Sequence, residues 1–354
     1  MQINRLTNLL IISIAVVVIL IYGQSLLVPF ICAWLVWFLI REITKFLNRA
    51  SFIRKHVPHW LNSLLASLLI FGILSVITRI LSDNIQNLAR AYPSYQSNIR
   101  LLTDQLVQWL NVDIEAYVTD LAGKMEFGKL LASIFNSLTD IIGNAVMIVI
   151  YVLFIFIEEA YFMPKLKAVF DKKSEFETVY GMLGQIGDSI THYVGLKTFV
   201  SVITGGLGYI VLMIIGVQAP FFWAFLLFLL NFIPTVGSLI GTLFPTVFAL
   251  LQFGEFLPAV YVLVFVGAIQ LLVGNVLEPK LMGNSLNISP LVTILSLSFW
   301  GAIWGITGMI MSVPITVILV LVFAHFPQTR PIAIMLSEKG QVTDGSNQAA
   351  EDEK

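Results

Sequence analysis

The sequence contains little charge and almost no cysteine. Only 12% of its 354 residues are charged, whereas a soluble globular chain carries about 25%. The formal net charge is -1, so no basic field indicates a nucleic-acid partner. The one cysteine, Cys32, cannot form a disulfide within the chain and says nothing about the redox compartment. These absences exclude an ordinary soluble domain and give no support to a nucleic-acid-binding function.

Apolar residues are abundant instead. They make up 58% of the chain, and the mean hydropathy is +0.89. We therefore predict an all-α, polytopic membrane protein of about eight transmembrane helices. Arg5 is the only basic residue before the first apolar run, residues 6–22, and no small-residue cleavage site follows the run. It is predicted to be a retained anchor and not a signal peptide.

Two basic loops set the predicted orientation. One follows the first apolar region at residues 41–55, and the other follows the apolar run 141–157 at residues 165–173. Basic residues beside spans stay in the cytoplasm, so both loops and the N-terminus are predicted to lie inside. The polar residues 83–140 between them are predicted to form amphipathic helices on the outer side.

The chain is divided into five predicted segments. Transmembrane helices occupy 1–82, the outer amphipathic insert 83–140, and a span with a cytoplasmic amphipathic helix 141–195. A transmembrane core with broken helices occupies 196–330, and 331–354 is predicted to be a disordered cytoplasmic tail. Within the core, Lys197 is expected to open a new span, and Pro314 is expected to end the span at 291–311.

The stretch 229–314 in the C-terminal half is the most informative. Pro234, Gly237, Gly241 and Pro245 interrupt its apolar residues beside Asn231. Proline bends a helix, and freed backbone groups are tolerated at membrane depth only against protein or water. The glycine spacing alone also fits an ordinary helix-packing face. Together with Asn231 and Pro245, the pattern favours a broken or re-entrant helix that lines a cavity.

A second polar group comprises Gln270, Asn275, Glu278 and Pro279. The amides of Gln270 and Asn275 lie within about 140° of each other on a helix and can recognise a hydroxylated solute. Glu278 could bind a cation or a proton, or it could simply mark a helix end at the inner interface. The predicted substrate-binding or translocation residues are Asn231, Pro234, Gly237, Gly241, Gln270, Asn275, Glu278 and Pro279. The predicted hinge residues are Pro245, Gly305, Gly308 and Pro314.

Signals for an enzyme are poor. The sequence contains no HExxH, no GxSxG and no phosphate-cradling Gly-rich loop. His56 and His59 flank Pro58 without a third ligand nearby, so no metal site and no cofactor are expected. Without a nucleotide site, any transport must use a gradient or be passive.

The runs NFIPTVGSLIG and NVLEPKLMGNSLNISPLVTILSLSFWGAIWGITGMIMSVP resemble the bacterial autoinducer-2 exporter family, also called PerM-like permeases. The resemblance covers nearly the whole chain. The residues of this sequence that match the family pattern are Pro234, Gly237, Gly241, Asn275, Pro279, Gly283, Pro290, Gly305, Gly308 and Pro314. It implies an inner-membrane, ATP-independent and homo-oligomeric transporter. Some members export the furanone signal autoinducer-2 and others are sodium–proton antiporters, so the resemblance implies transport more firmly than substrate.

Three hypotheses follow from the sequence. The first is a permease that exports a small polar solute, with autoinducer-2 as the leading candidate and Asn231, Gln270 and Asn275 as hydrogen-bonding groups. The second is a monovalent cation–proton antiporter that uses Glu278. The third is a membrane scaffold that binds a partner through the outer insert. Flux measurements in proteoliposomes separate the three.

The basic loops generate a topology prediction. In a variant that lacks Cys32, a cysteine at Arg49 or Lys172 should be shielded from an impermeant thiol reagent in intact cells. A cysteine at Asn111 should react, because it lies in the outer insert. Labelling at Arg49 without labelling at Asn111 would reverse the orientation.

Overall fold

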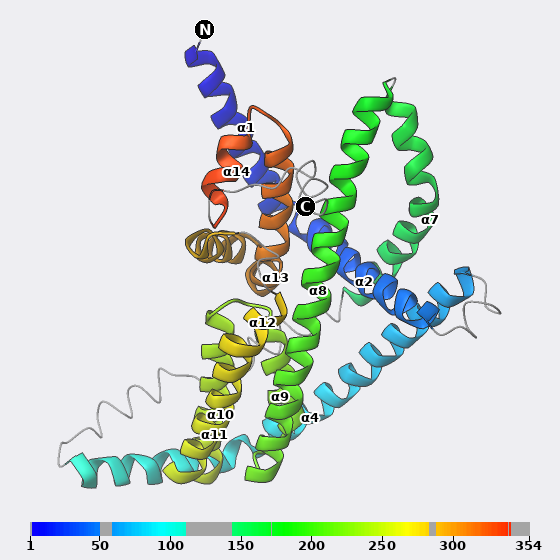
Figure 1. The fold of residues 1–354 in the computed structure, drawn as a ribbon. Coiled ribbons are helices and arrows are strands. Elements are labelled where there is room, and N and C mark those ends of the chain that lie inside the picture. The colour runs from blue at the N-terminus through cyan, green and yellow to red at the C-terminus, as the bar shows by residue number, and fades with distance from the viewer. Residues whose placement is uncertain are drawn as a thin grey trace. The chain divides into compact units, whose positions relative to one another are not determined.

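The computed structural model describes residues 2–49, 59–110, 144–170, 172–282, 288–338 and 340. Every regular element within these ranges is a helix, which confirms the predicted all-α fold (Figure 1). The helices are α1 (Gln2–Tyr22), α2 (Gln24–Arg49), α4 (His59–Leu110), α7 (Ala145–Val169), α8 (Lys173–Ile215), α9 (Pro220–Leu230), α10 (Val236–Phe253), α11 (Phe256–Leu272), the π-helix η1 (Val273–Leu277), α12 (Glu278–Met282), α13 (Pro290–His325) and α14 (Arg330–Leu336).

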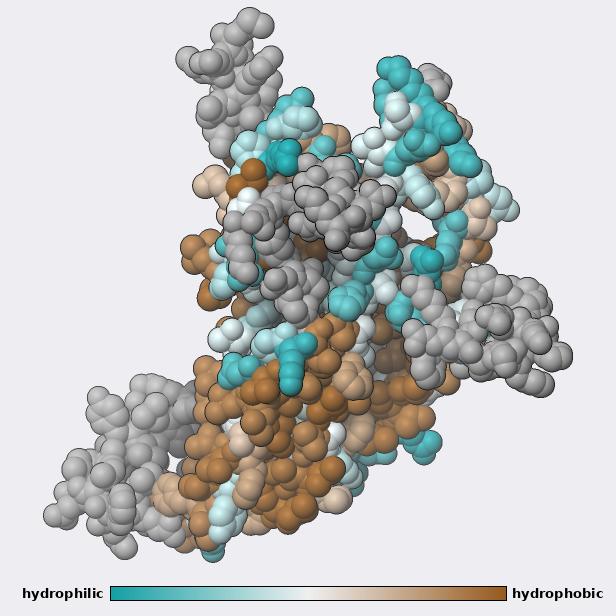
Figure 2. Space-filling model, in the orientation of Figure 1, coloured by the Kyte–Doolittle hydropathy of each residue, from teal (hydrophilic) through white to brown (hydrophobic). Residues whose placement is uncertain are grey.

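Seven helices in the described part of the chain are long and apolar enough to cross a membrane. Helices satisfy their own backbone hydrogen bonds, which is the condition for a lipid-exposed segment. Large apolar side chains are correspondingly exposed, and Figure 2 shows them as a broad hydrophobic surface over α10 and α11. The chain is a multi-pass membrane protein. At 11 residues, α9 is about 16 Å long and too short to span.

The chain divides into two compact units. Unit 1 comprises Met1–Ala66, Gly143–Gly195 and Asn284–Lys354, and unit 2 comprises Ser67–Ile142 and Leu196–Gly283. The helices α4 and α8 therefore contribute one part to each unit. The expected separate amphipathic helix before Lys197 is not present, because α8 continues through this point without a break.

Aromatic packing joins α2 to α7 in unit 1. Phe30 and Tyr151 meet edge to face, with ring centroids 5.6 Å apart. The Trp37 indole donates a hydrogen bond of 3.0 Å to Glu159, and the Arg41 guanidinium lies 5.0 Å from the centroid of the same indole. Such amphipathic groups are typical of a membrane interface.

The helix α13, also in unit 1, reverses direction at Gly305. The backbone of Gly305 has φ 59° and ψ -139°, a conformation that is essentially confined to glycine. The Ser296 hydroxyl consequently donates to the Ser312 carbonyl at 3.0 Å, although sixteen residues separate them. A continuous helix would place these residues about 24 Å apart. Two helical arms therefore pack against each other on either side of Gly305.

This reversal corrects the expectation for Pro314. Pro314 is buried inside the second arm of α13, and the chain breaks at Trp304 and Gly305 instead. Proline was the more visible signal in the sequence, but one missing backbone donor bends a helix less than a glycine with positive φ. At the far end of this arm, α14 packs its Ala333 against Val320. The first residues of the predicted tail are thus helical, and residues 341–354 lie outside the described part.

In unit 2, the second half of α8 and the helices α9, α10 and α11 form a bundle. Each helix runs antiparallel to the one before it. An added Cβ at Gly205 would lie 3.0 Å from the Ala224 carbonyl oxygen of α9. The rings of Trp223 in α9 and Phe248 in α10 lie 4.8 Å apart. An added Cβ at Gly267 of α11 would lie 3.8 Å from Thr242 of α10. The chain breaks between the end of α9 at Leu230 and the start of α10 at Val236, beside Asn231 and Pro234.

One end of this helix bundle is held by polar side chains; we call it the base end and define it by Gly216, Gln218 and Gln252. The Gln252 amide accepts from the Gln218 backbone at 2.7 Å and donates to the Gly216 carbonyl at 2.9 Å. It thereby connects the turn before α9 to the last turn of α10.

The helix α4 reinforces the base end. Its Asn98 amide donates to the carbonyls of Leu251 and Gln252 at 2.9 and 2.8 Å, which caps the exposed carbonyls of α10. The Tyr95 hydroxyl donates to Gln218. Burial raises the pKa of Tyr95, so the phenol remains a donor. Residues 83–110 of the predicted insert are thus helical, and 111–143 lie outside the described residues.

Two glycines at the reversals generate a stability prediction. A Cβ at Gly237 would lie 1.7 Å from the Leu230 carbonyl oxygen, and one at Gly308 would lie 1.9 Å from that of Trp300. Gly237→Ala and Gly308→Ala should each lower stability by about 3 kcal/mol, because neither backbone can move aside. Gly206→Ala is the control: its Cβ meets nothing within 4 Å, so helix propensity should raise stability by about 0.5–1 kcal/mol. Equal melting temperatures for all three purified variants would contradict the packing.

Candidate functional site

The predicted polar residues of unit 2 converge at the end of the bundle opposite the base. Antiparallel packing brings the start of the unit-2 part of α8, the end of α9, the start of α10 and the end of α11 together. We call this the tip end and define it by Lys197, Asn231, Gly237, Gln270 and Glu278. The structure thus brings together residues that lie up to 81 positions apart in sequence.

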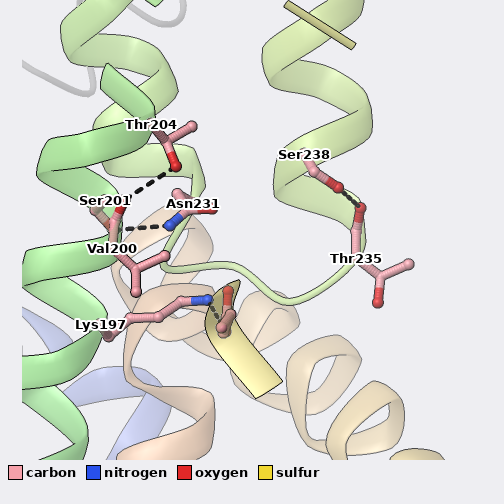
Figure 3. Close-up of polar contacts among 8 residues, drawn as sticks. Lys197, Val200, Ser201, Thr204, Asn231, Thr235 and Ser238 are labelled. Atoms are coloured by element: carbon pink, nitrogen blue, oxygen red, sulfur yellow. Dashed lines mark hydrogen bonds and ion pairs between the residues drawn. The ribbon is translucent and has the colours of Figure 1, made fainter. Parts of the chain in front are cut away.

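The turn between α9 and α10 is strained. Thr235 has φ 60° and ψ -56°, and the Val236 amide donates to the Pro234 carbonyl at 2.6 Å. This is a γ-turn with positive φ, which is rare and costs about 1–3 kcal/mol for a residue with a side chain. Its Thr235 carbonyl accepts from the Ser238 hydroxyl at 2.8 Å (Figure 3). Strain of this kind persists where the surrounding packing fixes the backbone.

Asn231 ends α9 and points into the bundle. It is 5% exposed, and its amide donates to the Ser201 hydroxyl of α8 at 2.9 Å (Figure 3). Ser201 itself is completely buried. This bond holds the end of α9 against α8, so Asn231 has a positioning role whether or not it contacts a solute.

Among the described residues, the Gln270 amide nitrogen is a buried polar atom that lacks a hydrogen-bond partner, as is the Trp223 indole nitrogen in α9. Gln270 is 6% exposed. A Cβ at Gly241 would lie only 3.3 Å from that nitrogen, so this glycine leaves room for the Gln270 amide. A buried donor without an acceptor costs about 1–3 kcal/mol. The tip end therefore contains an amide N–H group that can donate a hydrogen bond to an oxygen atom of a ligand.

Pro245 leaves a backbone carbonyl group near Gln270 without its usual helical donor. Because proline has no amide hydrogen, the Gly241 carbonyl receives no helical hydrogen bond from position 245. Hydroxyl groups satisfy the neighbouring carbonyls: Thr242 donates to Ser238 and Thr246 donates to Thr242. Pro245 nevertheless lies within the helix α10 and does not end it.

The residues of the second predicted group differ in exposure. The π-helical turn η1 replaces the usual hydrogen bond with one from the Glu278 amide to the Val273 carbonyl, and so changes the angular spacing assumed for an α-helix. Asn275 and Pro279 are exposed, whereas Gln270 is buried. The role of Asn275 as a second hydrogen-bonding group beside the buried Gln270 amide stays a prediction.

Glu278 forms an ion pair with Lys197 (Figure 3). The Lys197 side chain is 4% exposed and that of Glu278 is 22% exposed. Glu278 is thus not a solvated marker of a helix end. Its charge is compensated within unit 2, which a free cation-binding carboxylate would not be.

Sequence reasoning missed Lys197 as a site residue and treated it only as the start of a span. The usable signal was an ionisable residue followed at one-turn spacing by Ser201, within otherwise apolar residues. The strain at Thr235 left no sequence signal. Gly305 and Gly308 belong to unit 1, at the reversal of α13. In the part of the chain that the structure describes, no cluster of His, Cys, Asp and Glu could hold a metal.

Comparisons with known proteins agree with this architecture. The model of the AI-2E family transporter matches residues 10–328. The AI-2 transport protein TqsA of Escherichia coli K12 is 30% identical over 323 residues, which cover 90% of this chain and 91% of TqsA. A Haemophilus influenzae protein with a provisional transport-protein name is 30% identical over 358 residues and covers 96% and 99% of the two chains. Bacillus subtilis YrrI, named in the same provisional way, is 25% identical over 322 residues.

The family model spans most of the chain, including both reversals and the tip end. The similarity to TqsA and to the Haemophilus protein extends over almost the full length of each. These relatives are transport proteins by name, and none is named as an enzyme. The chain therefore belongs to the AI-2E family of membrane transporters.

Proposed function

We propose that the protein exports a small, uncharged, oxygen-rich solute and that the tip end of unit 2 binds it. The observation that carries the proposal is the buried Gln270 amide nitrogen without an acceptor. A hydroxyl or ring oxygen of a solute would supply that acceptor. The Gly241 carbonyl, which lacks a donor from Pro245, would accept from a solute hydroxyl.

Autoinducer-2 is the leading candidate for the solute. The relative TqsA is named as an AI-2 transport protein, and this furanone offers several hydroxyl groups for an amide to recognise. Residues Asn231, Pro234 and Gly237 would shape the site from the α9–α10 turn. Asn275 remains a predicted ligand on the exposed π-helical turn. Pro245, Gly305, Gly308 and Pro314 remain proposed hinge residues.

The remaining features of the proposal follow from the sequence and the bacterial relatives. The protein would lie in the inner membrane as a homo-oligomer and would act without ATP or any other cofactor. The α9–α10 pair, whose first helix is too short to span, would form a re-entrant hairpin. An antiporter is less well supported, because the charge of Glu278 is already compensated by Lys197.

The proposal predicts a specific effect of replacing Gln270. Gln270→Met keeps the approximate shape and removes the unpaired donor, so the melting temperature should stay equal or rise. The apparent KM for furanone flux in proteoliposomes should rise about tenfold, because losing a hydrogen bond of about 1.4 kcal/mol is a factor of ten. A KM equal to that of the wild type would contradict the assignment.

Two variants serve as controls. Gln252→Met removes the same amide at the base end, where it makes two hydrogen bonds. It should lower the melting temperature and leave the apparent KM unchanged. Asn275→Ala tests whether the exposed amide also binds the solute. If Asn275→Ala raises KM and Gln270→Met does not, the solute lies at the π-helical turn instead.

A further inference from the structure

The ion pair between Lys197 and Glu278 is largely shielded from solvent, with side chains that are 4% and 22% exposed. Replacing a buried ion pair with apolar residues is often neutral or stabilising, whereas removing one partner costs about 3–5 kcal/mol. A charged pair among apolar helices therefore favours one arrangement of the helices over others more than it favours folding. Ionisable residues inside membrane segments are functional candidates by default.

The position of the pair in the chain indicates what it controls. The second segment of unit 2 begins at Leu196 and ends at Gly283. Lys197 follows the first of these points directly, and Glu278 precedes the second by a little more than one helical turn. The pair thus joins the helix that brings the chain into unit 2 to the helix that takes it out.

Both helices contain a weak point beside the pair. In α8, Gly195 precedes Lys197, and a Cβ there would meet nothing within 4 Å, so packing does not require glycine. Glycine in a helix costs about 0.5–1 kcal/mol relative to alanine and lets the helix bend. In the other helix, the π-helical turn η1 directly precedes Glu278. Such turns are frequent at functional sites.

We infer that Lys197 and Glu278 form an ionic clasp that opens and closes during each transport cycle and so gates the tip end. Closed, the clasp holds α12 against α8 one helical turn from Ser201, which binds Asn231. Opening at Gly195 and η1 exposes the face of α8 that carries Lys197. Lys197 is therefore a positioning residue that acts through α12. This inference rests on the proposed transport function.

Cysteine accessibility tests the clasp independently of any solute. Val200 is completely buried, lies one turn from Lys197 and makes no side-chain hydrogen bond, so Val200→Cys in a Cys32→Ser protein is a suitable reporter. With the clasp intact, a soluble thiol reagent should label it slowly in purified protein. Glu278→Gln leaves the Lys197 charge unpaired and should raise the labelling rate at least about tenfold.

Further variants separate a clasp from a purely structural contact. The charge exchange Lys197→Glu with Glu278→Lys should restore slow labelling. The apolar pair Lys197→Met with Glu278→Met should label slowly and keep its melting temperature, yet transport about tenfold more slowly, because the closed form opens less often. Lys280→Gln, a change in the same short helix at an exposed residue, should behave as the wild type in labelling and flux.

Two outcomes would overturn the inference. One is an apolar pair that transports at the wild-type rate, and the other is fast labelling that the charge exchange does not reverse. Failure of the proposed function would be recognisable separately. In that case furanone flux would be absent in the wild type, while the labelling rates would still follow the state of the clasp.

Discussion

A backbone in lipid must satisfy its own hydrogen bonds, and the rest of the structure depends on this constraint. Long helices meet it directly, but a chain that reverses within the apolar layer must bury its turn against protein. At both reversals a glycine lies almost against a carbonyl oxygen of the preceding arm: Gly237 against Leu230, and Gly308 against Trp300. The two turns are closed by backbone packed on backbone.

Hydroxyl side chains within the helices likewise form hydrogen bonds with backbone carbonyl groups. Thr204, Thr242 and Thr316 each donate to the carbonyl one turn earlier in their own helix. Such bonds give a buried hydroxyl a partner at little expense and are compatible with slight bending. In the described part of the chain, the Gln270 amide nitrogen and the Trp223 indole nitrogen have no such partner, and of the two only Gln270 lies at the tip end.

The sequence predicted the parts of the fold that depend on hydropathy and on composition. The helical break beside Asn231 and Pro234 and the helical start of the insert follow from local patterns. The reversal at Gly305 did not, since a glycine looks alike whether φ is positive or negative. The π-helical turn that contains Asn275 was not predicted, because such a turn has no distinct composition. The partner of Glu278 could not be predicted, because pairing across 81 residues depends on tertiary packing.

The separation of Lys197 from Glu278 along the chain has a consequence for biosynthesis. The contacts that close the α9–α10 turn lie within seven residues of each other and can form as soon as α10 has left the ribosome. Lys197 is synthesised long before Glu278 and reaches the bilayer without its counter-charge. An unpaired lysine at that depth is costly, and its long side chain would hold α8 near the interface. Final insertion of α8 would therefore wait for α12, so that the second charge of this pair to be translated completes the burial of the first.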